Sequence, residues 1–370
     1  MKLINKKFSS ITFRVIIYKI LPYLQYKCEK ASDINIKALF GYFEHDYTRK
    51  IWLIWRGLCY ANISEFIELT QFPILTSLTI DYCDNMSELK EYPYLISIYS
   101  HWCNISELKE YPLLTSLVLI KCYNIIKLNE FPLLTSLHIH RGDISELIKY
   151  PLLTSLTIEY CDNINGLKES ISFPLLTSLT IKYCENITKL ISLPLLTSLA
   201  LRYCRNINKL EEQDSFPLLG SLIIENCDNI NELKEYPILT SLEISGSSII
   251  KLVPFLLLTS LSLYNSDISE LKDFPLLTTL YLCNCRNISI LKEYPCLTSL
   301  TLWSCDNINK LEKYILLTFL TLKWCKKITE LKELISCPLL TFLEIWKCKY
   351  LKYIKTENVE EMQQYIQKYT

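Results

Sequence analysis

The chain has 370 residues, of which half are hydrophobic and 21% are charged, a balance typical of folded protein rather than disordered protein. It carries 39 basic and 39 acidic residues, so the formal net charge is zero. A chain without net charge has no overall field to gather phosphates, and we expect no nucleic-acid partner. Only six glycines occur, which argues against the glycine-rich loops that cradle phosphate groups.

The most apolar early stretch does not predict a membrane span. It covers residues 11–24, it is interrupted by Arg14, Lys19 and Pro22, and it is too short to cross a bilayer. The same charges argue against a secretory signal. We therefore expect no membrane partner and a location in a reducing, cytosol-like compartment.

Residues 1–50 are predicted to form a small helical region, with helices near residues 9–25 and 35–44. The run over residues 16–24, followed by Trp52 and Trp55, resembles an F-box. That resemblance implies a Skp1-type adaptor as partner and a role as substrate receptor of a ubiquitin ligase. The usual Leu-Pro at the start of the motif is missing, however, and the gap to the tryptophans is too long.

Residues 51–72 offer a second interpretation of this region. Cys59, Ile63 and Phe66 have the spacing of a degenerate first repeat, which would assign Trp52 and Trp55 to a strand. Residues 1–50 would then be an N-terminal cap of the repeat array.

Residues 73–355 consist of fourteen repeats of the unit P-L-L-T-S-L-x-I-x-x-C-x-N-I-x-x-L-x-x-[YF]. Successive units are separated by 19, 20 or 23 residues. Leu256 and Ile315 stand in two units at the position that proline holds in the others. A fixed period of this length is the signature of a solenoid, in which each unit buries its apolar face against its neighbours.

The core of the unit is L-x-x-L-x-L-x-x-C-x-x-I, as in Leu176, Leu179, Ile181, Cys184 and Ile187. It resembles the leucine-rich-repeat family in its cysteine-containing variety, with a short unit, and more loosely the leucine-rich-repeat proteins of giant DNA viruses. The resemblance implies an α/β fold with one parallel β-sheet on the concave face. It also implies a protein-binding function, in the host cytosol if the chain is viral.

The spacing of the apolar residues within the unit predicts the same architecture. Leu179 and Ile181 lie two residues apart, so both point to one face of a strand while Thr180 points to the other. The 10 to 12 remaining residues must return the chain. Because a proline lies near their end and helix-forming runs are few, we expect extended or 3₁₀ returns on the convex face.

Most of the sixteen cysteines share one position of the repeat. One thiol per unit predicts a single file of buried, reduced cysteines rather than disulfides or a zinc site, because a buried free thiol behaves as a small hydrophobe. The eleven cysteines at this position are 83, 103, 122, 161, 184, 204, 227, 285, 305, 325 and 348.

No pattern indicates catalysis or a cofactor. His138 and His140 are expected to face outward on one strand, two units from His101, which is too far for shared metal ligation. The sequence lacks the motifs of nucleophilic or metal-assisted hydrolysis. We therefore expect a non-catalytic protein without cofactor or metal, and an enzyme with an unrecognised site remains a remote alternative.

The outward strand positions vary while the inward positions repeat leucine and isoleucine, as expected if the outward face binds a protein partner. The alternative is that these positions only contact water, so that their sequence varies without any binding function. The strongest binding candidates cluster near the C-terminal end, where exposed aromatic side chains are typical interface anchors. They are Trp303, Phe319, Lys323, Trp324, Phe342, Trp346 and Lys347.

Residues 356–370 are predicted to form a helical cap. Asn358 with Glu361 three residues later is loosely like a capping box. Val359, Met362, Ile366 and Tyr369 form an apolar stripe that could cover the open end of the core or fold over the tryptophans.

Overall fold

The computed structural model describes part of the chain, and every structural statement below concerns that part. It comprises residues 50–53, 76–81, 93–103, 108, 110–122, 131–141, 150–161, 173–190, 192–207, 210 and 216–370. The predicted helices of residues 1–50 and the F-box-like run lie outside it. Trp52 lies inside it, in a strand.

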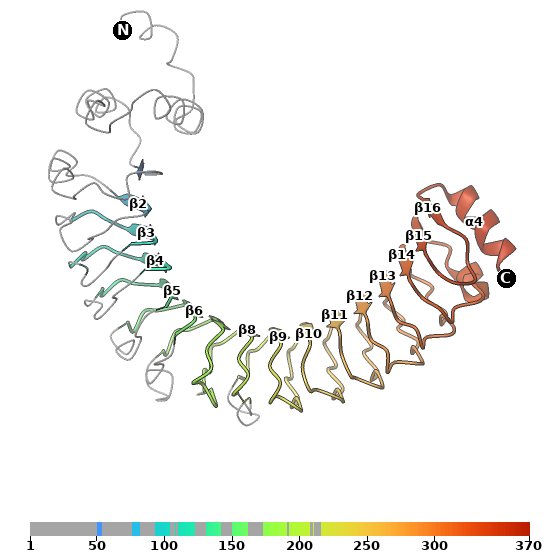
Figure 1. Cartoon of the computed structure of the whole chain (residues 1–370), viewed down its shortest axis with the longest axis horizontal. Coiled ribbons are helices and arrows are strands. Elements are labelled where there is room, and N and C mark those ends of the chain that lie inside the picture. The colour runs from blue at the N-terminus through green and yellow to red at the C-terminus, as the bar shows by residue number, and fades with distance from the viewer. Residues whose placement is uncertain are drawn as a thin grey trace, which may run out of the picture.

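The described chain is a regular parallel β-solenoid that follows an arc (Figure 1). Its single sixteen-stranded sheet has the strands in sequence order, and all neighbours are parallel except the last two. The strands are β1 (Lys50–Leu53), β2 (Ser77–Asp81), β3 (Ser97–His101), β4 (Ser116–Ile120), β5 (Ser136–His140), β6 (Ser155–Glu159), β7 (Ser178–Lys182), β8 (Ser198–Arg202), β9 (Ser221–Glu225), β10 (Ser241–Ser245), β11 (Ser260–Tyr264), β12 (Thr279–Cys283), β13 (Ser299–Trp303), β14 (Phe319–Lys323), β15 (Phe342–Trp346) and β16 (Ile354–Thr356).

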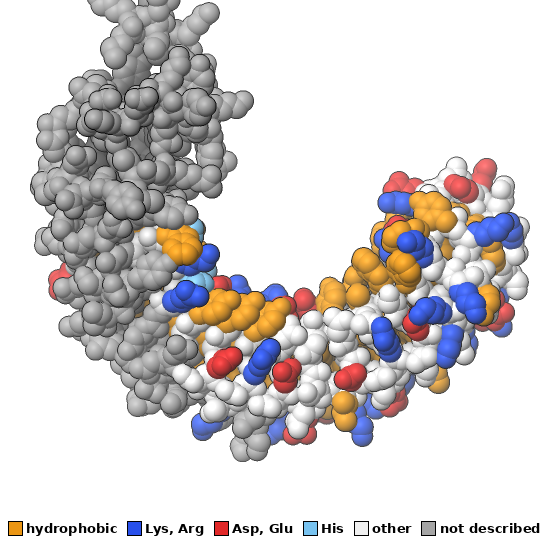
Figure 2. All heavy atoms as spheres, in the orientation of Figure 1, with side chains coloured by type: hydrophobic (Ala, Val, Ile, Leu, Met, Phe, Trp, Pro, Cys, Tyr) orange, Lys and Arg blue, Asp and Glu red, His pale blue; other side chains and the backbone are white. Residues whose placement is uncertain are grey.

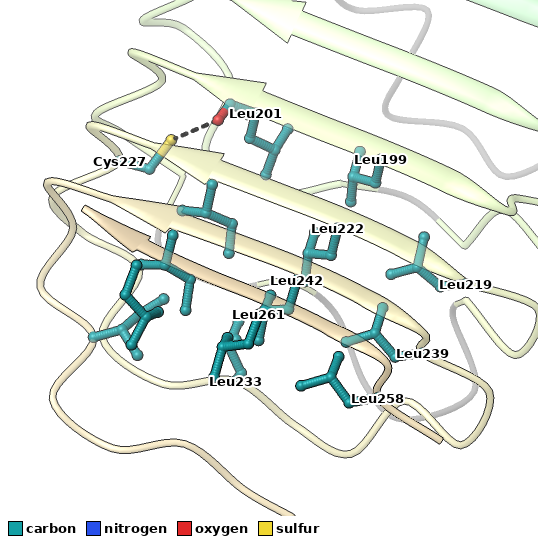
Figure 3. Packing of buried hydrophobic residues seen from close by; sticks show 14 of the residues in the cluster. Leu199, Leu201, Leu219, Leu222, Cys227, Leu233, Leu239, Leu242, Leu258 and Leu261 are labelled. Atoms are coloured by element: carbon teal, nitrogen blue, oxygen red, sulfur yellow. Dashed lines mark hydrogen bonds between the residues drawn. The ribbon is translucent and has the colours of Figure 1, made fainter. Parts of the chain in front are cut away.

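The strand pattern follows from the two-residue alternation. In β9, Leu222 and Ile224 are buried while Ser221, Ile223 and Glu225 face away from the core. The strands pair without any shift, leucine opposite leucine, so the inward side chains form continuous rows (Figure 3). A one-residue slip would turn every leucine outward, which is why the register is the same along the array.

The ladder cysteines confirm the prediction of buried thiols. All ten that lie in the described residues are buried, and none of them forms a disulfide. The Cys227 thiol donates to the Leu201 carbonyl at 3.6 Å (Figure 3) and to the Glu225 carbonyl at 3.4 Å. Each thiol thus satisfies backbone oxygens at the strand ends while filling a small space in the core.

A row of threonines stabilises the turn before most of the strands. The Thr298 hydroxyl donates to the Thr278 carbonyl at 3.1 Å, and the Thr318 hydroxyl repeats this contact to Thr298 at 3.0 Å. The partners lie 19, 20 or 23 residues apart along the chain, one turn of the solenoid. These contacts tie each turn to its predecessor, which a one-dimensional array needs in place of a globular core.

The residue just after each of the strands β3 to β15 has a left-handed backbone. Gly246 fits this position, but its equivalents include Tyr183 (φ 54°) and Trp324 (φ 58°). A side chain in this conformation costs about 1–2 kcal/mol. At all of these positions except Lys121 and Lys347, the backbone N–H donates to the last carbonyl of the next strand, as from Trp324 to Trp346 at 2.9 Å. This bond compensates for the strain and starts the return.

The described parts of the returns are extended, as expected, apart from one 3₁₀ segment among them. No α-helix interrupts the returns within residues 216–353, and η7 (Lys332–Ser336) occupies the additional length of a 23-residue unit just before Pro338. Here the insertion places Leu334 in the core while the chain around it stays on the surface.

The C-terminal end closes the array in a way that the repeat did not predict. β16 runs antiparallel to β15, and α4 (Val359–Lys368) follows it. The helix begins at Asn358, whose side-chain oxygen accepts a hydrogen bond from the Glu361 backbone N–H at 3.0 Å, so the predicted helix start is confirmed.

The predicted apolar stripe of this helix is wrong at its first member. Met362 and Ile366 are buried in the core cluster and Tyr369 packs against it, but Val359 is exposed. Tyr365 packs there too, and its hydroxyl donates to the Lys352 carbonyl. Val359 is the first helical residue, so it lies a turn too early to reach the core end.

Within the described residues, no helix combines the length and the apolar character that a bilayer crossing would require.

Candidate functional site

The candidate site lies where β13, β14 and β15 end. Trp303 and Trp346 are the last residues of β13 and β15, and Lys323 ends β14 between them. Strand pairing sets Trp303 opposite Lys323 and Lys323 opposite Trp346. Trp324 and Lys347 follow directly, in the left-handed positions after β14 and β15. We call these five residues the Trp–Lys cluster.

Lys347 is the centre of the cluster. Its Nζ lies 4.4 Å from the ring centroid of Trp324 and 4.8 Å from that of Trp346. The two indoles meet edge to face, with centroids 5.9 Å apart and planes at 77°. An ammonium over an indole face is attracted by the ring quadrupole, worth roughly 0.5–1 kcal/mol at an exposed site. This contact holds the lysine in place without neutralising its charge.

Lys323 is arranged differently. Its Nζ lies 3.0 Å from Glu344 Oε2 on the neighbouring strand and 5.8 Å from the Trp303 ring centroid. Lys323 therefore has a carboxylate partner, whereas no carboxylate of the described residues pairs with Lys347.

The two phenylalanines form a separate feature. Phe319 and Phe342 stack with ring centroids 4.3 Å apart and an interplanar angle of 3°. They begin β14 and β15, whereas the Trp–Lys cluster lies where those strands end, about 13 Å away at the usual rise per residue. Thr321 and Glu344 lie between the two groups on the same face. The seven candidate residues thus divide into the cluster and the Phe pair.

The tryptophans remain accessible. Trp303 and Trp324 are 40% exposed and Trp346 is 38% exposed. The alternative in which the C-terminal helix folds over them is therefore wrong, because α4 inserts Met362 and Ile366 into the end of the core instead. Figure 2 shows hydrophobic and basic side chains gathered at this end of the arc.

Charges on the middle of the sheet face are paired with one another. Lys182 Nζ lies 2.6 Å from Glu159 Oε1, and the Arg202 guanidinium contacts the Glu225 carboxylate. The two pairs occupy the last positions of four successive strands, β6 to β9. This region offers a partner little charge that is not already neutralised.

The prediction that both strand histidines face solvent is wrong for His140. It is 7% exposed, and its ring centroid lies 5.0 Å from that of Tyr160. Burial lowers the pKa of His140, and it lowers that of His138 as well, because the charged ring loses hydration. His138 Nε2 lies 3.5 Å from Glu159 Oε1. The part of the chain that the structure describes holds no group of three or more residues that could bind a metal.

A line of tyrosines was missed in the sequence. Tyr160, Tyr183 and Tyr203 stack with centroids 4.4 and 4.5 Å apart, along the left-handed positions after β6, β7 and β8. The Arg141 guanidinium lies 5.6 Å from the first ring. The signal was available, because these residues all precede a ladder cysteine.

Comparison of the sequence with protein-family models and with curated proteins gave no match. The class of protein is therefore defined by the structure itself, as a regular parallel β-solenoid with turns of 19 to 23 residues.

Proposed function

We propose that this solenoid is a leucine-rich-repeat protein that acts as a non-catalytic scaffold and binds another protein with its sheet face. The repeated leucine, isoleucine and cysteine ladder supports the family assignment. The strand labels follow the inner edge of the arc in Figure 1, which supports a sheet on the concave side. Such a face can contact a partner over many strands at once.

The observation that carries this proposal is the exposure of three tryptophans at the ends of three adjacent strands. Exposed tryptophan side chains leave apolar surface in water, and tryptophan is enriched among the residues that dominate binding energy. In this chain Trp324 and Trp346 contact Lys347, and Trp303 lies near Lys323, so one contact region offers apolar rings and cations together.

This combination indicates the chemistry of the partner. An aliphatic or aromatic side chain would cover the indoles, and a carboxylate would pair with the Lys347 ammonium. We therefore infer a protein segment that presents an apolar anchor next to an aspartate or glutamate. The Phe pair at the other end of the same strands would contact a further apolar residue of that segment.

The proposed location is the cytosol, or the host cytosol if the loose likeness to giant-virus proteins reflects origin. The row of thiols that form no disulfide among the described residues supports a reducing compartment, because an oxidising one favours disulfides.

The test is affinity purification of the full chain followed by measurement of the affinity for the recovered partner. Changing Trp303→Ala and Trp346→Ala together should weaken binding by at least thirtyfold, which corresponds to about 2 kcal/mol. Tyr353→Ala is the matched control, because Tyr353 is a more exposed aromatic residue near the same end but outside the cluster. It should leave the affinity unchanged.

Thermal melting separates binding from folding. A double variant that binds normally would contradict the proposal. So would a double variant that loses binding together with a large drop in Tm, because the tryptophans would then be structural.

A further inference from the structure

A row of exposed apolar side chains runs along the edge of the solenoid where the strands begin. In each described turn the residue three positions before the strand is apolar, and in all but one of them it is between 38% and 52% exposed. We call this row the leucine ridge. Its members are Tyr94, Leu113, Leu133, Leu152, Leu175, Leu195, Leu218, Ile238, Leu257, Leu276, Cys296, Leu316 and Leu339.

The ridge is continuous because the strands pair without a shift. The first residues of neighbouring strands are opposite each other throughout, as for Ser241 and Ser260 or Thr279 and Ser299. Positions equally far before those residues therefore line up as well, spaced by about 4.8 Å, the distance between strands.

The apolar composition of the leucine ridge is not what contact with water alone would favour. A few residues before the ridge position, the same return is charged, as in Lys292–Glu293. Even at the proline position the two replacements are Leu256 and Ile315, which are 67% and 49% exposed.

The ridge side chains offer few polar groups to a partner, since only Tyr94 and Cys296 among its members carry one. The prolines beside it have no N–H. In eleven of the thirteen turns a threonine lies two positions after the ridge residue and uses its hydroxyl to bond the preceding turn, as Thr259 does to the Thr240 carbonyl at 3.0 Å. A polar or charged surface would therefore lose hydration here and gain few hydrogen bonds.

We propose that the leucine ridge is a self-association surface, on which two copies of this chain pair ridge to ridge in a symmetric dimer. A partner that covers every member of the row needs apolar groups at the same spacing along the same arc, and a second copy has both. The twelve most exposed members together expose on the order of 800 Å² of apolar surface, which is the area per partner of a standard interface.

Twofold symmetry suits this geometry. An axis that crosses the middle of the arc superposes one ridge on the other with the chains running in opposite directions, so the same patch serves both copies. The ridge lies before the strands and the Trp–Lys cluster lies after them. The dimer would thus leave both copies of the cluster accessible.

The first test compares the mass in solution of three full-length proteins by sedimentation at micromolar concentration. We expect the natural chain at twice 43.4 kDa. The ridge variant Leu257→Lys, Leu276→Lys, Leu316→Lys should be monomeric with an unchanged circular dichroism spectrum. The matched control Ile250→Lys, Ile290→Lys, Ile335→Lys adds the same charge at exposed apolar positions outside the ridge and should remain dimeric.

The second test needs no variant. Cys296 lies on the ridge and Cys283 lies on the sheet face, and both are partly exposed, while the other described cysteines are buried. Maleimide labelling, read at each cysteine by mass spectrometry, should slow at Cys296 by at least tenfold as protein concentration rises. Labelling of Cys283 should not change.

A monomeric natural chain, a ridge variant that stays dimeric, or equal labelling of both cysteines at all concentrations would overturn the inference. So would a monomer that floats with phosphatidylcholine vesicles, since a lipid surface would then be the occupant. All these measurements use the protein without any partner, so their outcome does not depend on whether the Trp–Lys cluster binds a protein.

Discussion

The contact between α4 and the end of the core allows the most direct test of how the array is closed. Met362 and Ile366 are the buried residues of the helix, at 2% and 6% exposure. Removing either side chain to alanine costs about 2–5 kcal/mol. Because both lie on one helix, Met362→Ala with Ile366→Ala should weaken docking by at least about 4 kcal/mol, a thousandfold rise in the open population.

Hydrogen exchange reports this opening at single amides. The Leu331 N–H donates to the Tyr369 carbonyl at 2.9 Å, and the Lys352 N–H donates to the Tyr369 hydroxyl at 3.2 Å. Both amides lose their partner when the helix leaves, so their exchange should accelerate strongly in the double variant. Amides of β10, far along the array, should be much less affected because units couple mainly to their neighbours.

Val359→Ala is the matched control, since Val359 belongs to the same helix and is exposed. It should leave exchange unchanged. If the double variant exchanged like the natural chain at Leu331 and Lys352, the helix would not be a cap. If β10 accelerated as much as the terminal amides, the array would unfold as one unit and the nearest-neighbour reasoning would be refuted.

Three further outcomes are expected. The ladder cysteines should resist a thiol reagent in the native protein and react after denaturation without reductant; disulfides found instead would refute the single file of reduced thiols. His140→Gln should reduce the loss of Tm between about pH 7 and pH 5. Burial lowers the pKa of His140 in the folded protein from 6.5, so below that pH the unfolded chain binds a proton that the native state does not bind, and stability falls. An unchanged pH dependence of Tm in the variant would contradict this. Gly246→Ala should lower the free energy of unfolding by about 1–2 kcal/mol, measured by urea unfolding. The backbone φ is +54° at this position, and a Cβ would lie 2.3 Å from the Asn226 side-chain oxygen. An unchanged free energy of unfolding would show that the backbone strain and the side-chain clash both relax.

The sequence by itself determined the repeated part of the molecule. The two-residue spacing of Leu179 and Ile181 sets the inward face of a strand, and repetition of the unit places the next strand beside it in the same register. The burial of the cysteines and the helix start at Asn358 were also predictable, because each depends on position within one unit or on local hydrogen bonds.

The tertiary structure decided what depends on neighbours in space. His140 is buried because the Tyr160 ring of the next turn lies beside it, and Lys347 lies between two indoles because its backbone turns left-handed after β15. The antiparallel β16 exists only at the end of the array, where no further unit supplies a parallel partner. A periodic sequence specifies the lattice, whereas side-chain contacts across turns and the closure of an open end depend on which residues the lattice brings together.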